Sequence, residues 1–151
     1  MKLPGEILMI EDSLTDAELA QRAITMAGIA NPLTIVTDAE EGLARLHGTG
    51  AYAKAGPYRP RLVLLDLNLP GMSGIEFLRR IKGDASTCEI PVVVLSLSEN
   101  DRNIMACVRL GSGGYIIKPL DPDNLIRVAA KLKLPLTLLP SPATTKRARE
   151  A

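Results

Sequence analysis

Polar or charged residues directly follow four of the five short apolar runs in this chain. In chain order these residues are Glu11, Asp12, Asp66, Ser96 and Lys118. In an open sheet of parallel strands, the residues at the carboxyl ends of the strands share one edge, and ligands bind there. We therefore expect these side chains to meet at one site.

The residue types at this edge suit phosphoryl chemistry. Neighbouring carboxylates repel one another, so either their pKa values rise or a cation joins them. An all-oxygen ligand set favours Mg²⁺ over zinc. Asp66 could then be the nucleophile that accepts a phosphoryl group as an aspartyl phosphate. The Lys118 ammonium and Mg²⁺ would neutralise the phosphoryl oxygens, and the Ser96 hydroxyl would donate a further hydrogen bond.

The apolar runs themselves predict the fold. They are continuously apolar rather than alternating, which is typical of parallel strands covered on both faces. Amphipathic segments separate them, so the pattern predicts five βα units in an α/β fold. The pattern alone leaves the strand order open, and we expect the doubly wound, flavodoxin-like order 2-1-3-4-5 with five helices. The expected strands are 7–10, 33–36, 62–65, 92–95 and 115–117.

The starts of the helices are also marked in the sequence. In each of four segments a serine or threonine stands three residues before an aspartate or glutamate, a spacing typical of a capping box. A fifth helix is expected to begin with Asp121 as its cap and Pro122 at its first position. The four segments are 13–16, 37–40, 73–76 and 98–101.

Composition narrows the class of protein. The chain has 151 residues, a net charge of +1 and no long apolar stretch. The balanced charge argues against a nucleic-acid partner, and no segment approaches the length of a membrane helix. Residues 1–6 lack a signal-peptide core, and Cys88 and Cys107 have no metal-site or redox-motif spacing. We expect one cytoplasmic domain with two free thiols.

Several motifs together resemble the receiver domains of bacterial response regulators. The resemblance implies that Asp66 is the phosphoacceptor and that the chain is a signalling protein, rather than an enzyme with an external substrate. Its own chemistry would be phosphorylation and slow dephosphorylation. The donor would be a sensor histidine kinase. The motifs are Glu11-Asp12-Ser13, the run from Asp66 to Gly74, the run from Pro91 to Ser96, and Tyr115-Ile116-Ile117-Lys118-Pro119.

The same resemblance implies roles for the surrounding residues. Glu11 and Asp12 would hold Mg²⁺ together with Asp66 and the backbone carbonyl of Asn68. Tyr115 would be the aromatic side chain that changes rotamer upon phosphorylation. Ser96 and Lys118 would bind the phosphoryl group. The peptide bond between Lys118 and Pro119 would be cis.

A narrower resemblance concerns the single-domain response regulators associated with phytochromes. It rests on the loop at 48–60, the Asp-Leu-Asn-Leu-Pro sequence at 66–70 and the strand at 90–96. It implies a bacterial phytochrome as the kinase and a homodimer as the assembly. With no output domain expected after the receiver, the signal would pass through protein–protein contacts.

We expect the receiver domain to span 5–133 and a C-terminal extension to span 134–151. Its apolar part, 134–140, either folds back on the domain or packs on a partner, and we favour a dimer contact because an exposed apolar segment is adhesive. The remainder, 141–151, is polar and expected to be disordered.

Other functions fit the residues less well. A phosphatase of the haloacid dehalogenase type needs a second aspartate two residues after the nucleophile, where this chain has Asn68. A dinucleotide enzyme would show a GxGxxG motif after the first strand, and none is present. A docking or dimerisation module that works without phosphorylation remains the alternative.

Overall fold

Strands and helices alternate along the computed structural model, which describes residues 5–134 and 136–139. A single 3₁₀ turn, η1 (Gly50–Tyr52), interrupts the alternation after the second helix. The strands are β1 (Ile7–Ile10), β2 (Leu33–Val36), β3 (Leu62–Asp66), β4 (Val92–Ser96) and β5 (Gly114–Ile117). The α-helices are α1 (Leu14–Met26), α2 (Ala39–His47), α3 (Gly74–Lys82), α4 (Arg102–Leu110) and α5 (Pro122–Leu132).

The five strands form one parallel sheet in the order β2-β1-β3-β4-β5, as predicted. The register pairs Ile10 with Leu65, Asp66 with Leu95, and Ser96 with Ile117. The carboxyl ends of β1, β3, β4 and β5 therefore meet at one edge of the sheet.

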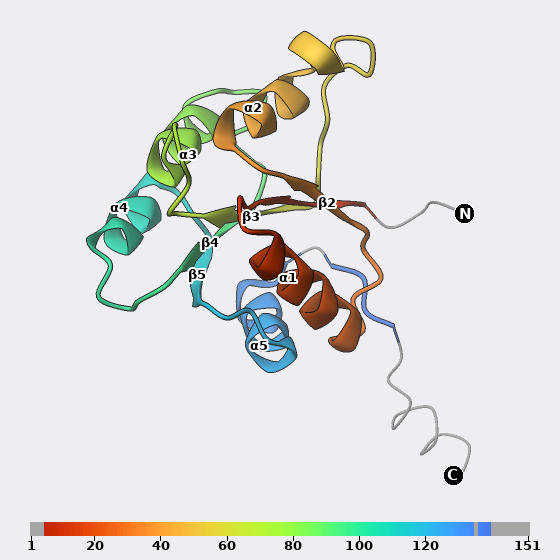
Figure 1. Ribbon diagram of the computed structural model, residues 1–151, viewed down its shortest axis with the longest axis vertical. Coiled ribbons are helices and arrows are strands. Elements are labelled where there is room, and N and C mark those ends of the chain that lie inside the picture. Colours follow the sequence, from red (N-terminus) through yellow and green to blue (C-terminus); the bar gives the residue numbers. More distant parts are fainter. Residues whose placement is uncertain (1–4, 135, 140–151) are drawn as a thin grey trace, which may run out of the picture.

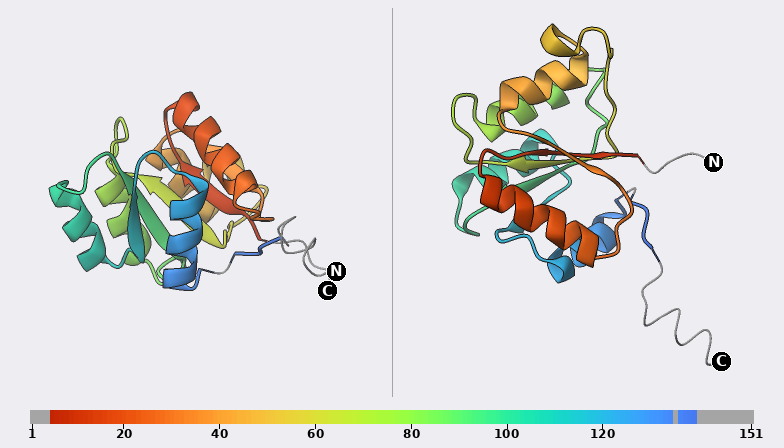
Figure 2. Two further views of the ribbon diagram at one scale, coloured as in Figure 1. Left: turned by 90° about the horizontal axis from the view of Figure 1, so that it is seen from below. Right: turned by 45° about the vertical axis from the view of Figure 1, so that its right-hand side comes forward.

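Helices cover both faces of the sheet, which explains why the strands are continuously apolar. Helices α2, α3 and α4 lie on one face, and α1 and α5 lie on the other (Figures 1 and 2). Each face has its own apolar core. Phe77 of α3 is fully buried on the face covered by α2, α3 and α4, and Ile24 of α1 is buried on the opposite side.

Side-chain caps begin every α-helix, although two predicted caps were wrong. Ser13, Ser73 and Asp121 accept backbone N–H groups as expected. Helix α2 is capped by Asp38 rather than Thr37, and α4 by Asp101 rather than Ser98. In both segments two competent caps lie close together, and the carboxylate is the one that bonds the helix N–H.

Side-chain contacts anchor the loop at 48–60 to the rest of the domain. The Arg45 guanidinium lies over the ring of Tyr52 at 5.1 Å and over that of Tyr58 at 4.6 Å. The Tyr58 hydroxyl donates a hydrogen bond to Glu6, just before β1. The inserted residues thus pack on α2 and on the start of the sheet.

The C-terminal segment, residues 136–139, folds back on its own domain. The Ala30 N–H donates to the Thr137 carbonyl at 2.7 Å, and the Leu139 N–H donates to the Gly28 carbonyl at 2.6 Å. Leu134 and Leu136 pack against the core beneath α1 and α5. The fold-back alternative is therefore confirmed for these residues, whereas the expected disorder of 141–151 lies outside the described residues.

Cys88 and Cys107 are both free thiols, as predicted. Among residues 5–134 and 136–139, no helix is both long enough and apolar enough to cross a membrane.

Candidate functional site

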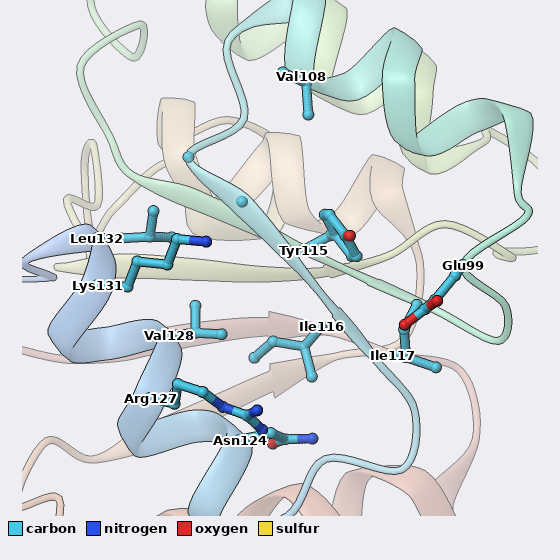
Figure 3. Close-up of a pocket in the computed structure, with 12 residues that line it drawn as sticks. Glu99, Val108, Tyr115, Ile116, Ile117, Asn124, Arg127, Val128, Lys131 and Leu132 are labelled. Carbon is cyan, nitrogen blue, oxygen red and sulfur yellow. The ribbon is translucent and has the colours of Figure 1, made fainter.

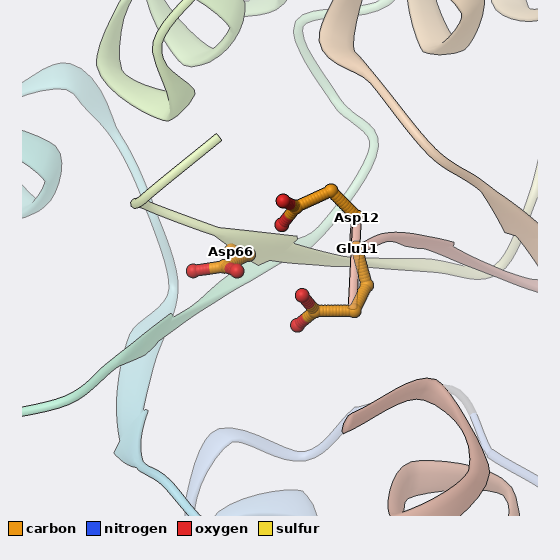
Figure 4. A group of neighbouring side chains, drawn as sticks. All are labelled: Glu11, Asp12 and Asp66. Atoms are coloured by element: carbon orange, nitrogen blue, oxygen red, sulfur yellow. The ribbon is translucent and has the colours of Figure 1, made fainter. Parts of the chain in front are cut away.

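Three carboxylates meet at the predicted edge of the sheet. Glu11 and Asp12 directly follow β1, and Asp66 is the last residue of the adjacent β3. One oxygen from each lies within 4.8 Å of the other two, and Figure 4 shows both β1 carboxylates extending toward Asp66. We call these residues the carboxylate cluster. Its donor set, entirely carboxylate oxygen, fits a hard divalent cation such as Mg²⁺.

Burial divides the carboxylate cluster. Glu11 and Asp66 are 1% and 2% exposed, whereas Asp12 is exposed to solvent. Burial raises the pKa of Glu11 to about 7, although hydrogen bonds from Lys118 and the Ser13 N–H act in the opposite direction. A buried carboxyl beside a second carboxylate is the electrostatic situation that a cation relieves.

Two donors from different elements hold the Asp66 carboxylate. The backbone N–H of Asn68 donates to Oδ1 at 3.0 Å, and the Lys118 ammonium donates to Oδ2 at 3.0 Å. Lys118 directly follows β5, and its bond to Pro119 is cis, as expected. The lysine therefore reaches across β4 to β3, the strand that ends in Asp66.

The Lys118 ammonium also contacts two further carboxylates. Its Nζ donates to Glu11 Oε2 at 2.8 Å and to Asp16 Oδ2 at 3.0 Å. Burial alone would lower the pKa of Lys118, but hydrogen bonds to Glu11, Asp16 and Asp66 outweigh it and raise the pKa. The lysine is therefore held as a cation.

Asp16 is the site residue that the sequence did not reveal. Its position three residues after Ser13 indicated a capping acid, and its backbone N–H does bond the Ser13 hydroxyl at 3.2 Å. Its side chain instead turns toward Lys118, 102 positions further along the chain. Only the packing of α1 beside the end of β5 brings the two together, so no local spacing could have indicated the contact.

Ser96 lies at the edge beside Asp66, but its hydroxyl bonds residues near the start of α4. The residue is fully buried at the end of β4. Its Oγ lies 3.0 Å from the Ser98 carbonyl and 3.2 Å from Asp101 Oδ2, either of which can accept its proton. The hydroxyl is thus bonded to the start of α4.

Tyr115 is not part of the carboxylate cluster. Its side chain is 43% exposed and lines a cavity of about 490 Å³ between α4, β5 and α5. Figure 3 shows it on the outer side of β5, with Val108 from α4 and Arg127 from α5 around the same cavity. The expected rotamer change would therefore start from an outward position.

The sequence profile of the response regulator receiver domain matches residues 7–130. The chain belongs to this family. The receiver domain is 36% identical to the response regulator Rcp1 of Synechocystis sp. (strain ATCC 27184 / PCC 6803 / Kazusa) over 125 residues. The match covers 83% of this chain and 84% of Rcp1.

Solved structures of response regulators share the architecture of this receiver domain. The bacteriophytochrome response regulator AtBRR superposes with a TM-score of 0.82 at 31% identity, over 93% of this chain and all of that one (100%). The Mn²⁺-bound form of Rcp1 superposes with a TM-score of 0.73 at 35% identity, over 91% of this chain and 100% of that one. The family match confirms the predicted receiver domain, and the similarity to AtBRR agrees with the predicted resemblance to phytochrome-associated response regulators.

Proposed function

We propose that this receiver domain accepts a phosphoryl group on Asp66 from a sensor histidine kinase. The observation that carries the proposal is the convergence on Asp66, at the end of β3, of an ammonium from the end of β5 and two carboxylates from the end of β1. Phosphoryl transfer depends mainly on positioning and on neutralising charge. Both requirements are met by Lys118 and by a cation site of oxygen ligands.

In the proposed reaction, an Asp66 carboxylate oxygen attacks phosphorus as the bond from phosphorus to the phosphohistidine nitrogen breaks. The Lys118 ammonium, which donates to the Asp66 carboxylate before the transfer, then donates to a phosphoryl oxygen. Glu11, Asp12 and Asp66, with the backbone carbonyl of Asn68, would hold Mg²⁺, which supplies positive charge to the phosphoryl oxygens. Attack by water on phosphorus later releases phosphate and restores the Asp66 carboxylate.

The signal would leave the site through Ser96 and Tyr115. A phosphoryl group on Asp66 offers the Ser96 hydroxyl a charged acceptor in place of its contacts near the start of α4. The space vacated by Ser96 would let Tyr115 turn inward, and the α4–β5–α5 surface would change. Two alternative packings biased by one local charge are sufficient for such a switch.

The choice of kinase and the assembly are finer parts of the same proposal. AtBRR is described as a bacteriophytochrome response regulator, and its similarity over 93% of this chain supports a phytochrome as the kinase. A homodimer is supported by the exposed side chains of Leu138 and Leu139 on the C-terminal segment. The module that works without phosphorylation is the competing function, and the complete set of site residues argues against it.

Intact-protein mass spectrometry after incubation with Mg²⁺ and acetyl phosphate tests the acceptor. Wild type should gain one phosphoryl group, and Asp66→Asn or chelation of the metal should abolish the gain. Glu18→Gln, a change at an exposed acid on α1, should behave as wild type. If wild type gains no phosphoryl group and also binds no fluoride mimic of that group, only the docking function remains.

A further inference from the structure

We propose that Asp16 is a positioning residue that holds the Lys118 ammonium in place during phosphoryl transfer to Asp66. The inference rests on the proposed function and adds a residue to its site. It starts from the contact between Asp16 Oδ2 and Lys118 Nζ at 3.0 Å, which joins α1 to the end of β5.

The hydrogen bonds of Lys118 are fully used in this structure. An ammonium has three N–H donors, and here they face Glu11, Asp16 and Asp66 at 2.8, 3.0 and 3.0 Å. When Asp66 is phosphorylated, the N–H that faces it must turn to a phosphoryl oxygen. The other two contacts then determine where the ammonium stays.

Asp16 differs from the other two acceptors in its relation to the cation site. Glu11 and Asp66 belong to the carboxylate cluster, so their charge is shared between a bound cation and Lys118. Within residues 5–134, Asp16 is the partner of Lys118 that lies outside that cluster. Its charge therefore remains available to the lysine whether or not the cation site is filled.

The surroundings leave Lys118 few other partners. The lysine side chain is 11% exposed, and the cavity beside it has a volume of only about 10 Å³, close to the minimum for a single water molecule. Its walls include the apolar side chains of Met9, Leu19 and Leu95, which offer an ammonium no strong hydrogen-bond acceptor. Without Asp16 the ammonium would lose its fixed third contact, and its position relative to Asp66 would become less defined.

The position of Asp16 on the helix limits the freedom of its side chain. Asp16 is the third residue of α1, and its backbone is fixed by the hydrogen bond to the Ser13 cap. A short side chain on an anchored helical turn has few rotamers, so it can direct Lys118 without itself touching the phosphoryl group. Misplacing a catalytic group by about 1 Å can lower a rate by up to about a hundredfold.

The test compares Asp16→Asn with wild type at saturating Mg²⁺, using the rate of phosphorylation by acetyl phosphate. We expect the rate to fall about tenfold while calorimetric Mg²⁺ affinity is unchanged. Asp16→Glu should restore part of the rate. The matched control is Glu18→Gln, on the same helix and exposed, which should leave both quantities at wild-type values. An unchanged rate in Asp16→Asn would overturn the proposal, as would a parallel loss of Mg²⁺ affinity and melting temperature.

A second measurement separates this inference from the proposed function. The exchange of the Lys118 ammonium protons with water can be followed by NMR of ¹⁵N-lysine-labelled protein with Mg²⁺ bound. Faster exchange in Asp16→Asn than in wild type supports the positioning role, even if wild type accepts no phosphoryl group. Equal exchange in the two proteins would contradict it.

Discussion

Glu11 and Asp12 are adjacent carboxylates with different environments. Glu11 is 1% exposed beside Asp66 and Lys118, whereas Asp12 faces solvent. Burial raises the pKa of Glu11 to about 7, so near neutral pH this carboxyl exchanges its proton. Metal ions bind the charged form of a carboxyl, so in the proposed Mg²⁺ site Glu11 would release this proton as the cation binds.

The raised pKa of Glu11 predicts how stability depends on pH in the absence of divalent cations. Between about pH 4.5 and 7 the folded protein retains a proton that the unfolded chain releases. The contribution of Glu11 to the free energy of unfolding is thus present below pH 4.5 and lost as pH rises through 7. The loss is on the order of 3 kcal/mol, at 1.36 kcal/mol per pKa unit.

Urea denaturation in EDTA at pH 5 and pH 8 measures this contribution. Glu11→Gln should flatten the pH dependence, because a neutral amide keeps its state across the range. Glu18→Gln serves as the control, since that acid is exposed. If Glu11→Gln and wild type lose the same stability between the two pH values, the buried carboxyl is not the group that titrates.

The residues of the site differ in how far the sequence could predict them. Asp66, Ser96 and Lys118 follow apolar runs, so the geometry of parallel sheets alone brings them to one edge. Asp16 follows no strand, and its contact with Lys118 depends on how α1 packs. Its local spacing also had an adequate explanation as a helix cap, which concealed the second use of the side chain.

At the scale of elements, Asp101 links the site to helix α4. Its Oδ1 accepts the Asn103 N–H at 2.9 Å, and its Oδ2 lies 3.2 Å from the Ser96 hydroxyl. Ser96 can turn to a phosphoryl group only by leaving these contacts. The same carboxylate therefore stabilises the start of α4 and the observed position of the buried Ser96 hydroxyl.

Asp101→Ala should both destabilise the protein and favour the phosphorylated arrangement. Loss of a helix cap costs about 1 kcal/mol, measurable by urea denaturation. Because Ser96 would lose one of its acceptors, binding of a beryllium fluoride mimic at Asp66 should become tighter. Asp121→Ala is the matched control, since it removes the cap of α5 without touching Ser96. Equal mimic affinity in the two variants would show that Asp101 does not restrain the hydroxyl.

Sequence reasoning predicted the existence of these elements better than their ends. The strands and their order follow from apolar runs that need cover on both faces. The start of α4 was predicted at Ser98 and lies at Asp101, because Ser98 instead caps a turn by accepting the Asn100 N–H at 3.1 Å. Both residues can cap locally, and Asp101 is the one whose carboxylate also lies 3.2 Å from the Ser96 hydroxyl, a contact that the capping-box spacing did not reveal.

At the scale of the whole molecule, the C-terminal segment joins distant parts of the chain. The buried amide of Asn31 donates to the Gly5 carbonyl at 2.7 Å and accepts the Thr137 N–H at 2.6 Å. The backbone of the segment is thus bound to its own domain, while Leu138 remains 59% exposed and Leu139 58% exposed. Folding back and contacting a partner are therefore compatible, because they use different side chains.

Two substitutions on this segment separate the two roles. Leu136 is partly buried against the core beneath α1 and α5, so Leu136→Ala should lower the free energy of unfolding by about 1–2 kcal/mol. Leu138→Ala removes an exposed side chain and should leave stability unchanged in dilute solution. If the exposed leucines form the dimer contact, Leu138→Ala should weaken the association of two copies. Sedimentation velocity over a range of protein concentrations measures this.

The pair is informative because each variant is the control for the other. Leu136→Ala changes packing within one domain, so it should shift the urea midpoint and leave the sedimentation profile of the folded protein unchanged. Leu138→Ala should do the reverse, since its side chain contributes little to the core of its own domain. A wild-type protein that sediments as a monomer at every concentration would contradict the homodimer and leave the segment with its role in folding.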